Sequence, residues 1–267
     1  MKVHVLQLSY DDLEDPDDRL DRVVALLDQQ KGADLLVLPE LWFNGGFSYA
    51  RWRETAQTLS DELVRRMQET ARRIGAVVHM GSLVEHAGER DDGSPLLYNT
   101  SVLIDSDGKV LTTYRKIHRF GFSDGEPQLM EAGEGLSTSA VRFGDEEVVV
   151  GLATCYDLRF PELFRGLVDR GAELVLVPAA WPLSRVEHWS VLGQARAIED
   201  QVFLVQCNTA GEHAGIAMGG SSSVIGPDGR RLRSAGHGEE ALVVDLDLAA
   251  VRAARRAFPV LADRRLG

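Results

Sequence analysis

Cys155 stands where an apolar run of the chain gives way to a polar one. The residues before it, Val148–Thr154, are β-prone or small and predict a buried strand. After it, Asp157 can cap a turn, and Pro161 and Glu162 suit a first helical turn. A thiol at a helix N-terminus faces amide dipoles, which lower a cysteine pKa and stabilise a developing oxyanion. The position predicts a nucleophile for acyl transfer, whereas a lone cysteine is more often a buried structural residue.

Two charged residues occupy comparable positions, each directly after a stretch that predicts a strand. Glu40 ends the apolar run 33–39, so its carboxylate is expected either in a restricted pocket, where it could serve as a base, or exposed at the start of a helix. Lys116 follows the β-prone stretch 110–114 and is expected either beside reactive groups or on the surface of an edge strand. Position alone does not separate these interpretations.

The elements that must position these residues alternate between short apolar runs and helical patterns. Strands are expected over residues 3–8, 33–39, 76–84, 97–104, 110–114, 148–154, 173–178, 202–206, 221–225, 231–233 and 241–245. Helical periodicity runs through residues 20–27, 60–74 with Ser60 as the N-cap, and 188–199. The similar runs at 33–39 and 173–178 are a weak sign of internal repetition. Strands interspersed with helices favour an α/β sandwich.

Length, charge and cysteine usage bound the class of protein. The 267 residues suit one domain, 1–267, with a C-terminal helix and tail over 246–267. Without a leader sequence or an apolar stretch of membrane-spanning length, a soluble cytoplasmic protein is expected. Acidic residues outnumber basic ones by 41 to 29, which argues against nucleic acid as a partner. Cys155 and Cys207 lack CxxC spacing, and neither a metal-ligand motif nor a nucleotide-binding glycine motif occurs, so no metal or cofactor is expected.

Three motifs around the reactive residues occur together. They are Leu38-Pro-Glu40, Tyr114-Arg-Lys-Ile-His118 and Cys155-Tyr-Asp-Leu-Arg-Phe-Pro-Glu162. In this order they resemble the nitrilase superfamily of carbon-nitrogen hydrolases, and the resemblance continues through 178–182, 195–199, 219–221 and 227–229. It implies a four-layer α-β-β-α sandwich and a Glu-Lys-Cys triad, with Glu40 as the general base, Lys116 as the cationic stabiliser and Cys155 as the nucleophile.

The resemblance also implies a further glutamate between the lysine and the cysteine, ahead of a glycine. Glu126 fits best, before Gly133, while Glu131 and Glu134 lie close enough to remain alternatives. A carboxylate beside Lys116 would keep its amine protonated and oriented.

The implied reaction passes through a covalent intermediate. Cys155, deprotonated by Glu40, would attack an electrophilic carbon while Lys116 and the Tyr156 backbone N–H stabilise the oxyanion, and water would hydrolyse the thioester. Histidine is the rival base, and the candidates are His118, His188 and His213. Lone histidines are more often hydrogen-bonded structural groups, so Glu40 is preferred.

The residue after the cysteine bears on the substrate. Tyr156 is typical of amidases, where true nitrilases tend to carry Trp-Glu, so a small aliphatic amide or an ω-amide is expected; N-carbamoyl amino acids and nitriles are alternatives. Arg159 or Arg185 could bind a substrate carboxylate, or could pack against nearby acids instead. Trp181 and His188 are further candidates for substrate contact. Loops 41–53, 118–132 and 181–188 are expected to shape the pocket, and the aromatic candidates for its wall are Trp42, Phe43, Phe120, Phe122, Trp181 and Trp189.

The sequence also bears on the oligomeric state and on a non-catalytic alternative. Members of the superfamily often pair, which implies a homodimer or a larger homo-oligomer through helices near 159–170 and 188–200 and the segment from Phe258. A non-catalytic partner-binding subunit, or a thiol sensor using Cys155, is the alternative of another class. The presence of Glu40 and Lys116 together with Cys155 favours the enzyme.

Overall fold

Two six-stranded sheets form the centre of the molecule, in a computed structural model that describes residues 1–265. The first sheet comprises β1 (Lys2–Gln7), β3 (Leu35–Val37), β4 (Val77–Glu89), β5 (Pro95–Ile104), β6 (Val110–Arg115) and β15 (Glu240–Asp245), in the order β15-β1-β3-β4-β5-β6. The second comprises β7 (Ser137–Phe143), β8 (Glu146–Leu152), β9 (Leu174–Ala179), β10 (Phe203–Asn208), β13 (Ser223–Ile225) and β14 (Arg231–Ser234), in the order β14-β13-β10-β9-β8-β7. A small third sheet joins β2 (Ser9–Tyr10), β11 (Ala210–His213) and β12 (Ile216–Ala217).

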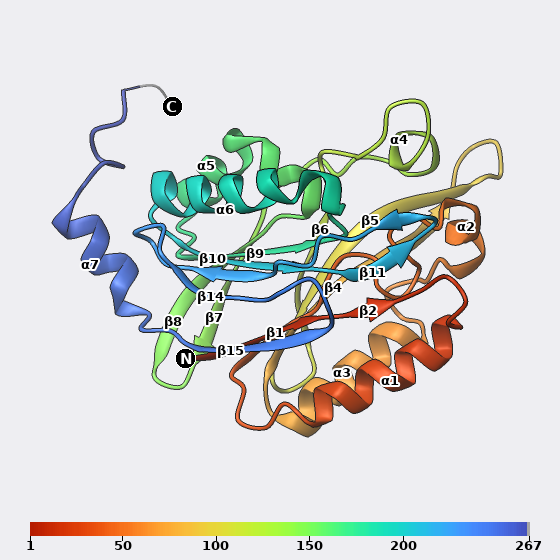
Figure 1. Cartoon of the computed structure of the whole chain (residues 1–267), viewed down its shortest axis with the longest axis horizontal. Helices are drawn as coiled ribbons and strands as arrows, with labels where there is room; N and C mark the ends of the chain where they lie inside the picture. The colour runs from red at the N-terminus through yellow and green to blue at the C-terminus, as the bar shows by residue number, and fades with distance from the viewer. Residues whose placement is uncertain (266–267) are drawn as a thin grey trace.

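Helices cover the outer face of each large sheet (Figure 1). Below the first sheet lie α1 (Pro16–Asp28) and α3 (Glu62–Ile74), whose apolar faces pack on strand residues such as Leu36 and Val78. Above the second lie α5 (Pro161–Asp169) and α6 (Val186–Asp200). The short helices α2 (Trp52–Thr55) and α4 (Glu126–Leu129) lie at one end of the sandwich, and α7 (Ala249–Ala257) lies at the other. The predicted four-layer α-β-β-α arrangement is confirmed.

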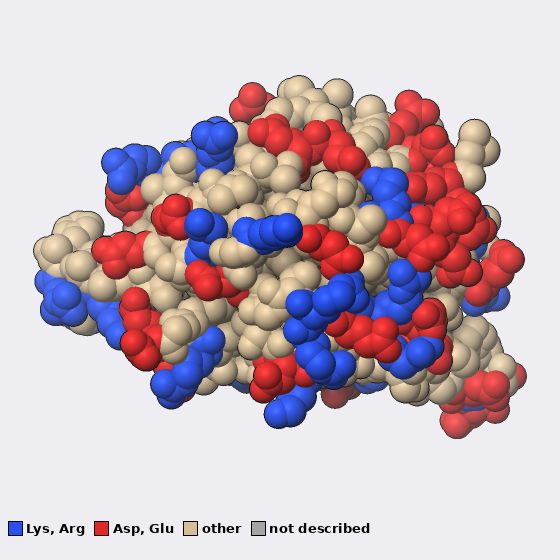
Figure 2. Space-filling view, turned by 90° about the horizontal axis from the view of Figure 1, so that it is seen from below, with Lys and Arg blue, Asp and Glu red and all other residues tan. Residues whose placement is uncertain are grey.

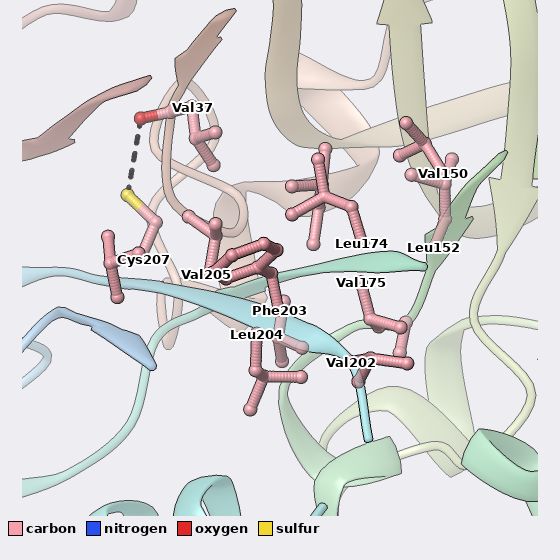
Figure 3. Packing of buried hydrophobic residues seen from close by; sticks show 14 of the residues in the cluster. Val37, Val150, Leu152, Leu174, Val175, Val202, Phe203, Leu204, Val205 and Cys207 are labelled. Carbon is pink, nitrogen blue, oxygen red and sulfur yellow. Dashed lines mark hydrogen bonds between the residues drawn. The ribbon is translucent and has the colours of Figure 1, made fainter. Parts of the chain in front are cut away.

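The two sheets meet through a core of aliphatic side chains. Val37 from the first sheet faces residues such as Leu174 and Val205 from the second (Figure 3), and all three are fully buried. Cys207 on β10 donates its thiol hydrogen to the carbonyl oxygens of Leu6, at 3.3 Å, and Val37, at 3.4 Å. This second cysteine is therefore a structural residue of the core.

The two similar runs of the sequence take equivalent places in the two sheets. β3 lies between two parallel neighbours, β1 and β4, and β9 lies between two parallel neighbours, β8 and β10. Chain segments that leave the carboxyl ends of these central strands therefore approach one another across the sandwich. One hydrogen bond shows the approach directly, because the Ala180 backbone N–H after β9 donates to the Glu40 carboxylate after β3.

Several local predictions differ from the structure. Asp61, not Ser60, occupies the N-cap position of α3. The helix α5 begins at Pro161 as predicted, but a 3-10 turn, Cys155–Arg159, separates it from β8, so the thiol lies at the start of that turn and not at the helix N-terminus. The edge strand β7 has no strongly apolar pattern and was not predicted. Two further 3-10 turns, Tyr49–Arg51 and Leu183–Arg185, lie within loops expected near the pocket.

The surface carries both signs of charge. Figure 2, which views the face covered by α1 and α3, shows basic and acidic side chains interspersed, with acidic ones gathered toward one end. This distribution agrees with the formal net charge of −12 and offers no continuous basic track on that face. Among residues 1–265, no helix is both long and apolar enough to cross a membrane.

Candidate active site

Four buried side chains form a closed ring of hydrogen bonds at the end of the sandwich that carries α2 and α4. Lys116 Nζ donates to Glu40 Oε1 at 2.8 Å and to Glu126 Oε1 at 3.0 Å. Asn99 Nδ2 donates to the same two oxygens, at 2.8 Å and 2.6 Å. Each carboxylate also accepts one backbone N–H on its second oxygen, from Ala180 for Glu40 and from Phe120 for Glu126. We call Glu40, Asn99, Lys116 and Glu126 the carboxylate ring.

Cys155 lies against this ring. Cys155 is 7% exposed, and its thiol shares a cavity with Glu40 and Lys116 and lies beside the Glu40 carboxylate. The residue has φ +48°, in the left-handed region, which turns the chain sharply out of β8. The alternative in which Glu40 and Lys116 are surface residues is wrong, since their exposed fractions are 3% and 2%.

The charges at the site are coupled. Burial would lower the pKa of Lys116, but the carboxylates of Glu126 and Glu40 outweigh burial and hold that pKa well above its usual range. Burial raises the pKa of Glu126, and the nearby Lys116 ammonium opposes the rise. The pKa of Cys155 is raised by burial and by the Glu40 carboxylate, so the predicted lowering is wrong. The resting cysteine is therefore a neutral thiol beside the Glu40 side chain.

The turn that carries the thiol is fixed by a buried carboxylate, as predicted for Asp157. Thr154 and Asp157 form a reciprocal capping box around the 3-10 turn. Asp157 also accepts hydrogen bonds from the Tyr114 hydroxyl, at 2.8 Å, and from the His118 backbone N–H, and it contacts His118 Nδ1 at 2.7 Å. The segments on either side of Lys116 are thereby tied to the turn that begins at Cys155.

The histidines weighed as rival bases have other contacts. His118 is held by Asp157 and stacks on Phe160 with ring centroids 3.6 Å apart. His213 stacks on Tyr10, and burial lowers its pKa to about 4. Neither lines the cavities that contain Cys155. Glu40 is therefore the basic side chain that the structure brings to the thiol.

Two adjoining hollows meet at Cys155. The inner one is lined by the charged members of the carboxylate ring together with Gly46, Phe47, Tyr49, Trp52, Phe120 and Ala180. The outer one is lined by Phe47, Phe120, Tyr156, Arg159, Ala180, Trp181, Pro182 and Arg185. The three loops predicted to shape the pocket all contribute to these walls.

The outer hollow brings together most of the residues predicted to bind substrate. The Arg159 guanidinium lies over the Trp181 ring, 4.8 Å from its centroid, and Arg185 lies over Phe120 at 5.4 Å. Within residues 1–265 neither arginine forms an ion pair, so the predicted alternative of pairing with nearby acids is not what the structure shows. We call Tyr156, Arg159, Trp181 and Arg185 the arginine wall.

Other predicted residues lie elsewhere. His188 is exposed and absent from the lining of both hollows; it contacts the site only through Arg159 Nη2, at 3.3 Å. Trp42, Phe43 and Trp189 belong to the core, and Phe122 is 85% exposed. Glu131 pairs with Arg90 away from the ring, and Glu134 is exposed, so Glu126 is the glutamate that reaches Lys116.

Sequence reasoning missed Asn99 and the close approach at Gly46. Asn99 lies on β5, and its carbonyl oxygen accepts the Lys116 backbone N–H at 2.8 Å, so pairing β5 with β6 would have placed it beside the lysine. A Cβ at Gly46 would lie 2.5 Å from the Ala180 Cβ, so the loop after Glu40 can pack against Ala180 only with glycine there.

Comparisons with known proteins agree with this geometry. The family model for carbon-nitrogen hydrolases matches residues 2–256. The chain belongs to the carbon-nitrogen hydrolase family. It is 43% identical over 265 residues to the 2-oxoglutaramate amidase of Paenarthrobacter nicotinovorans, covering 99% of this chain and 90% of that protein.

Solved structures extend the agreement to three dimensions. Nit3 of Saccharomyces cerevisiae, a member of branch 10 of the nitrilase superfamily, matches with a TM-score of 0.86 and 28% identity over 100% of this chain and 97% of the other. An amidase from Nesterenkonia sp. AN1, with the acetamide moiety of fluoroacetamide added covalently at its active-site cysteine, matches with a TM-score of 0.81 and 29% identity over 99% and 97%. The predicted family, fold and hydrolytic class are thus confirmed.

Proposed function

We propose that this hydrolase cleaves a short linear amide to a carboxylic acid and ammonia, with Cys155 as nucleophile, Glu40 as general base and Lys116 as oxyanion stabiliser. The observation that carries the proposal is the position of the Cys155 thiol beside the Glu40 carboxylate, whose Oε1 is bonded to the Lys116 ammonium. A thiol with a raised pKa needs a base in contact with it, and Glu40 supplies one.

The steps follow from the positions of the protons. Glu40 takes the thiol proton as the sulfur of Cys155 attacks the amide carbon, and the carbonyl oxygen becomes an oxyanion. Glu40 returns that proton to the nitrogen, ammonia leaves, and a thioester remains on Cys155. A water molecule then gives a proton to Glu40 and attacks the thioester; the resulting intermediate collapses to the acid as the sulfur regains the proton.

Lys116 is suited to the oxyanion by the number of its hydrogens. An ammonium has three N–H donors, and two of them are held by Glu40 and Glu126. The third is available to the substrate oxygen, and the Tyr156 backbone N–H in the adjoining 3-10 turn is the proposed second donor. Glu126 is proposed as the accessory residue that keeps Lys116 charged and directed.

The arginine wall supports a substrate with a carboxylate at its far end. Arg159 and Arg185 lie at the outer hollow without acidic partners among residues 1–265, and a guanidinium binds a carboxylate through charge-assisted hydrogen bonds. We therefore propose an ω-amide of a dicarboxylic acid, in keeping with the name of the 43% identical relative, 2-oxoglutaramate amidase. Trp181 and Tyr156 would pack along the chain between the two ends.

Ammonia release tests the proposal. The panel contains short neutral amides, ω-amides of dicarboxylic acids, N-carbamoyl amino acids and nitriles, since the same triad could act on each. We expect turnover of ω-amides that falls by about 10⁴-fold or more in Cys155→Ala, while Cys207→Ala, which changes the buried core thiol, retains it. Activity that survives in Cys155→Ala would refute the nucleophile, and a preference for nitriles would refute the amide.

Assembly and compartment are proposed on separate observations. Val191 and Ile198 on α6 and Phe258 after α7 are 58%, 52% and 69% exposed, which supports a homodimer through α5, α6 and the C-terminal segment. Leu266 and Gly267 lie outside the described residues. Light scattering at several concentrations tests this, and a monomer throughout would refute it. Two free buried cysteines suit a reducing cytoplasm, and the family match over 2–256 supports one domain.

A further inference from the structure

We propose that Asn99 is a positioning residue that keeps both carboxylates of the site ionised, by binding the same oxygen of each that binds Lys116. The inference rests on the proposed function in treating Glu40 as the base, and it concerns a residue that belongs to no motif of the chain singled out above.

The carboxylate ring holds two acidic side chains but one cationic hydrogen-bond donor. Two carboxylates share one ammonium, so their charges are only half compensated by Lys116. Like charges held this close favour uptake of a proton by one of them. Apart from Lys116 and the Cys155 thiol, which lies beside Glu40 alone, Asn99 is the one side chain within the described residues that donates to either carboxylate, and it donates to both. Its two N–H groups therefore stabilise the doubly ionised pair without adding a charge.

The orientation of the Asn99 amide is fixed by the same contacts. If the amide were rotated by 180°, its oxygen would lie 2.8 Å and 2.6 Å from two carboxylate oxygens, which is repulsive. Asn99 Oδ1 is buried and has no hydrogen-bond donor within residues 1–265. The hydrogen bonds that Asn99 Nδ2 donates to the two carboxylates therefore fix the orientation of the side chain.

The backbone explains how one amide reaches both acids. Asn99 on β5 accepts the Lys116 N–H with its main-chain oxygen, so its side chain and that of Lys116 leave adjacent strands beside each other. Glu40 approaches from the end of β3 and Glu126 from the start of α4. The amide therefore links two loops that carry acids to the strand pair that carries the cation.

The consequence is a definite direction of pH dependence. A base works only when ionised, so the acidic limb of activity reports protonation of the coupled carboxylate pair. Loss of the two N–H donors removes stabilisation of the ionised form alone and raises the apparent pKa of the pair. A hydrogen bond to a charged group corresponds to a shift of about one pH unit or more.

The experiment compares Asn99→Ala with Asn44→Ala. Asn44 is a matched control because it is a buried asparagine that also makes hydrogen bonds from both ends, to Thr55 and Val84, outside the ring. We measure kcat/KM for the amide turned over fastest by the wild type, from pH 5 to pH 10, on protein shown to be folded by its melting curve. Asn99→Asp is measured in parallel, since it replaces the donor with an acceptor of the same shape.

We expect the acidic limb of Asn99→Ala to move up by about one pH unit, with activity partly regained as the pH rises. Asn99→Asp should move the acidic limb further. Asn44→Ala should lower the melting temperature and leave the acidic limb where it is in the wild type. Alkylation of Cys155 by iodoacetamide, which needs no substrate, should show the same shifts because Glu40 takes the thiol proton.

The outcomes separate the two proposals. A shifted alkylation profile with no turnover of any amide would uphold the role of Asn99 and refute the proposed substrate. The role of Asn99 would be refuted by a second outcome. In it, turnover depends on Cys155, but the acidic limbs of the kcat/KM and alkylation profiles are the same in folded Asn99→Ala as in the wild type. An equal shift in Asn44→Ala would also refute it, because general loosening of the site would then explain both.

Discussion

The carboxylate ring and the arginine wall face the same cysteine but differ in how their charges are satisfied. In the ring, each carboxylate accepts hydrogen bonds from Asn99, from Lys116 and from the backbone. In the arginine wall, Arg159 and Arg185 have aromatic rings beneath them and no acidic partner among residues 1–265. The ring is complete within the protein, whereas the wall has donors left for another molecule.

This difference matches the two roles proposed above, reaction for the carboxylate ring and recognition for the arginine wall. A group that acts on protons must be held in one geometry before the substrate arrives, because reorganisation during the reaction would cost rate. A group that selects a substrate must keep unsatisfied donors until binding, and it then contributes to affinity. Changes to the carboxylate ring should therefore lower kcat, and changes to the arginine wall should raise KM, each without the other effect.

The largest effect is expected from Lys116→Leu. It would leave Glu40 and Glu126 buried side by side without a cation, so the pair should take up a proton, and the oxyanion should lose a donor. We expect kcat to fall by about 10³-fold, with a lower melting temperature. Lys109→Leu, which removes an exposed lysine from the turn before β6, is the control for loss of charge and should match the wild type. Activity within tenfold of the wild type, roughly, would contradict the oxyanion role.

A smaller and selective effect is expected from Arg159→Ala and Arg185→Ala. Each should raise KM for an ω-amide that carries a carboxylate by about 10-fold to 100-fold, the effect of one charge-assisted hydrogen bond. A neutral short amide should be turned over nearly as before, since its reaction uses only the ring. Arg142→Ala, on an exposed arginine of β7, serves as the control. Equal losses on charged and neutral amides would show that the arginines only support the pocket wall.

The smallest effect concerns Asp200, a buried carboxylate outside the pocket. Its Oδ1 lies 3.1 Å from Arg165 Nη1, but burial raises its pKa to about 6, above that of an unfolded chain. The neutral form therefore stabilises the fold below about pH 4, and this contribution is lost as the pH rises through 6. Asp200→Asn has no carboxylate charge to bury at high pH. Its free energy of unfolding should therefore exceed that of the wild type by about 1 to 2 kcal/mol at pH 8 and differ little at pH 4.

Urea unfolding at the two pH values measures this, with Glu187→Gln on the exposed side of the same helix as the control. If Asp200→Asn destabilised the protein equally at both pH values, the contact with Arg165 would outweigh burial. A buried carboxylate outside the ring would then be stable without a full set of hydrogen-bond donors.

The sequence was sufficient for the fold and for the residues that lie next to regular strands. Apolar runs fixed the places of β3, β8 and β9, and Glu40 and Cys155 follow such runs directly. Pro161 starts α5 as predicted, but the complete 3-10 turn capped by Asp157 separates Cys155 from that helix, so the thiol does not face the helix N-terminus as expected. The direction of the Cys155 pKa was wrong for a related reason, since burial and Glu40 outweigh the amide dipoles.

Residues brought in by long loops, or by pairing across strands, were harder to identify. Glu126, Glu131 and Glu134 were all candidates for the further glutamate, and only the course of loop 118–132 brings Glu126 to the lysine. Asn99 needed the register between β5 and β6, which periodicity does not supply. His188 lies on the expected helix, but the rotation of α6 leaves it exposed beside Arg159.

The ring also constrains how the protein can be produced. Asn99 is followed by Thr100 and Ser101, which makes it an acceptor sequence for N-linked glycans. In a eukaryotic secretory host, a sugar added to Asn99 Nδ2 before folding would occupy the nitrogen that both carboxylates share and could not fit in a site that is 2% exposed. Molecules glycosylated at this residue are therefore expected to be misfolded or inactive, and analysis of the glycopeptide in the soluble and aggregated fractions would show which.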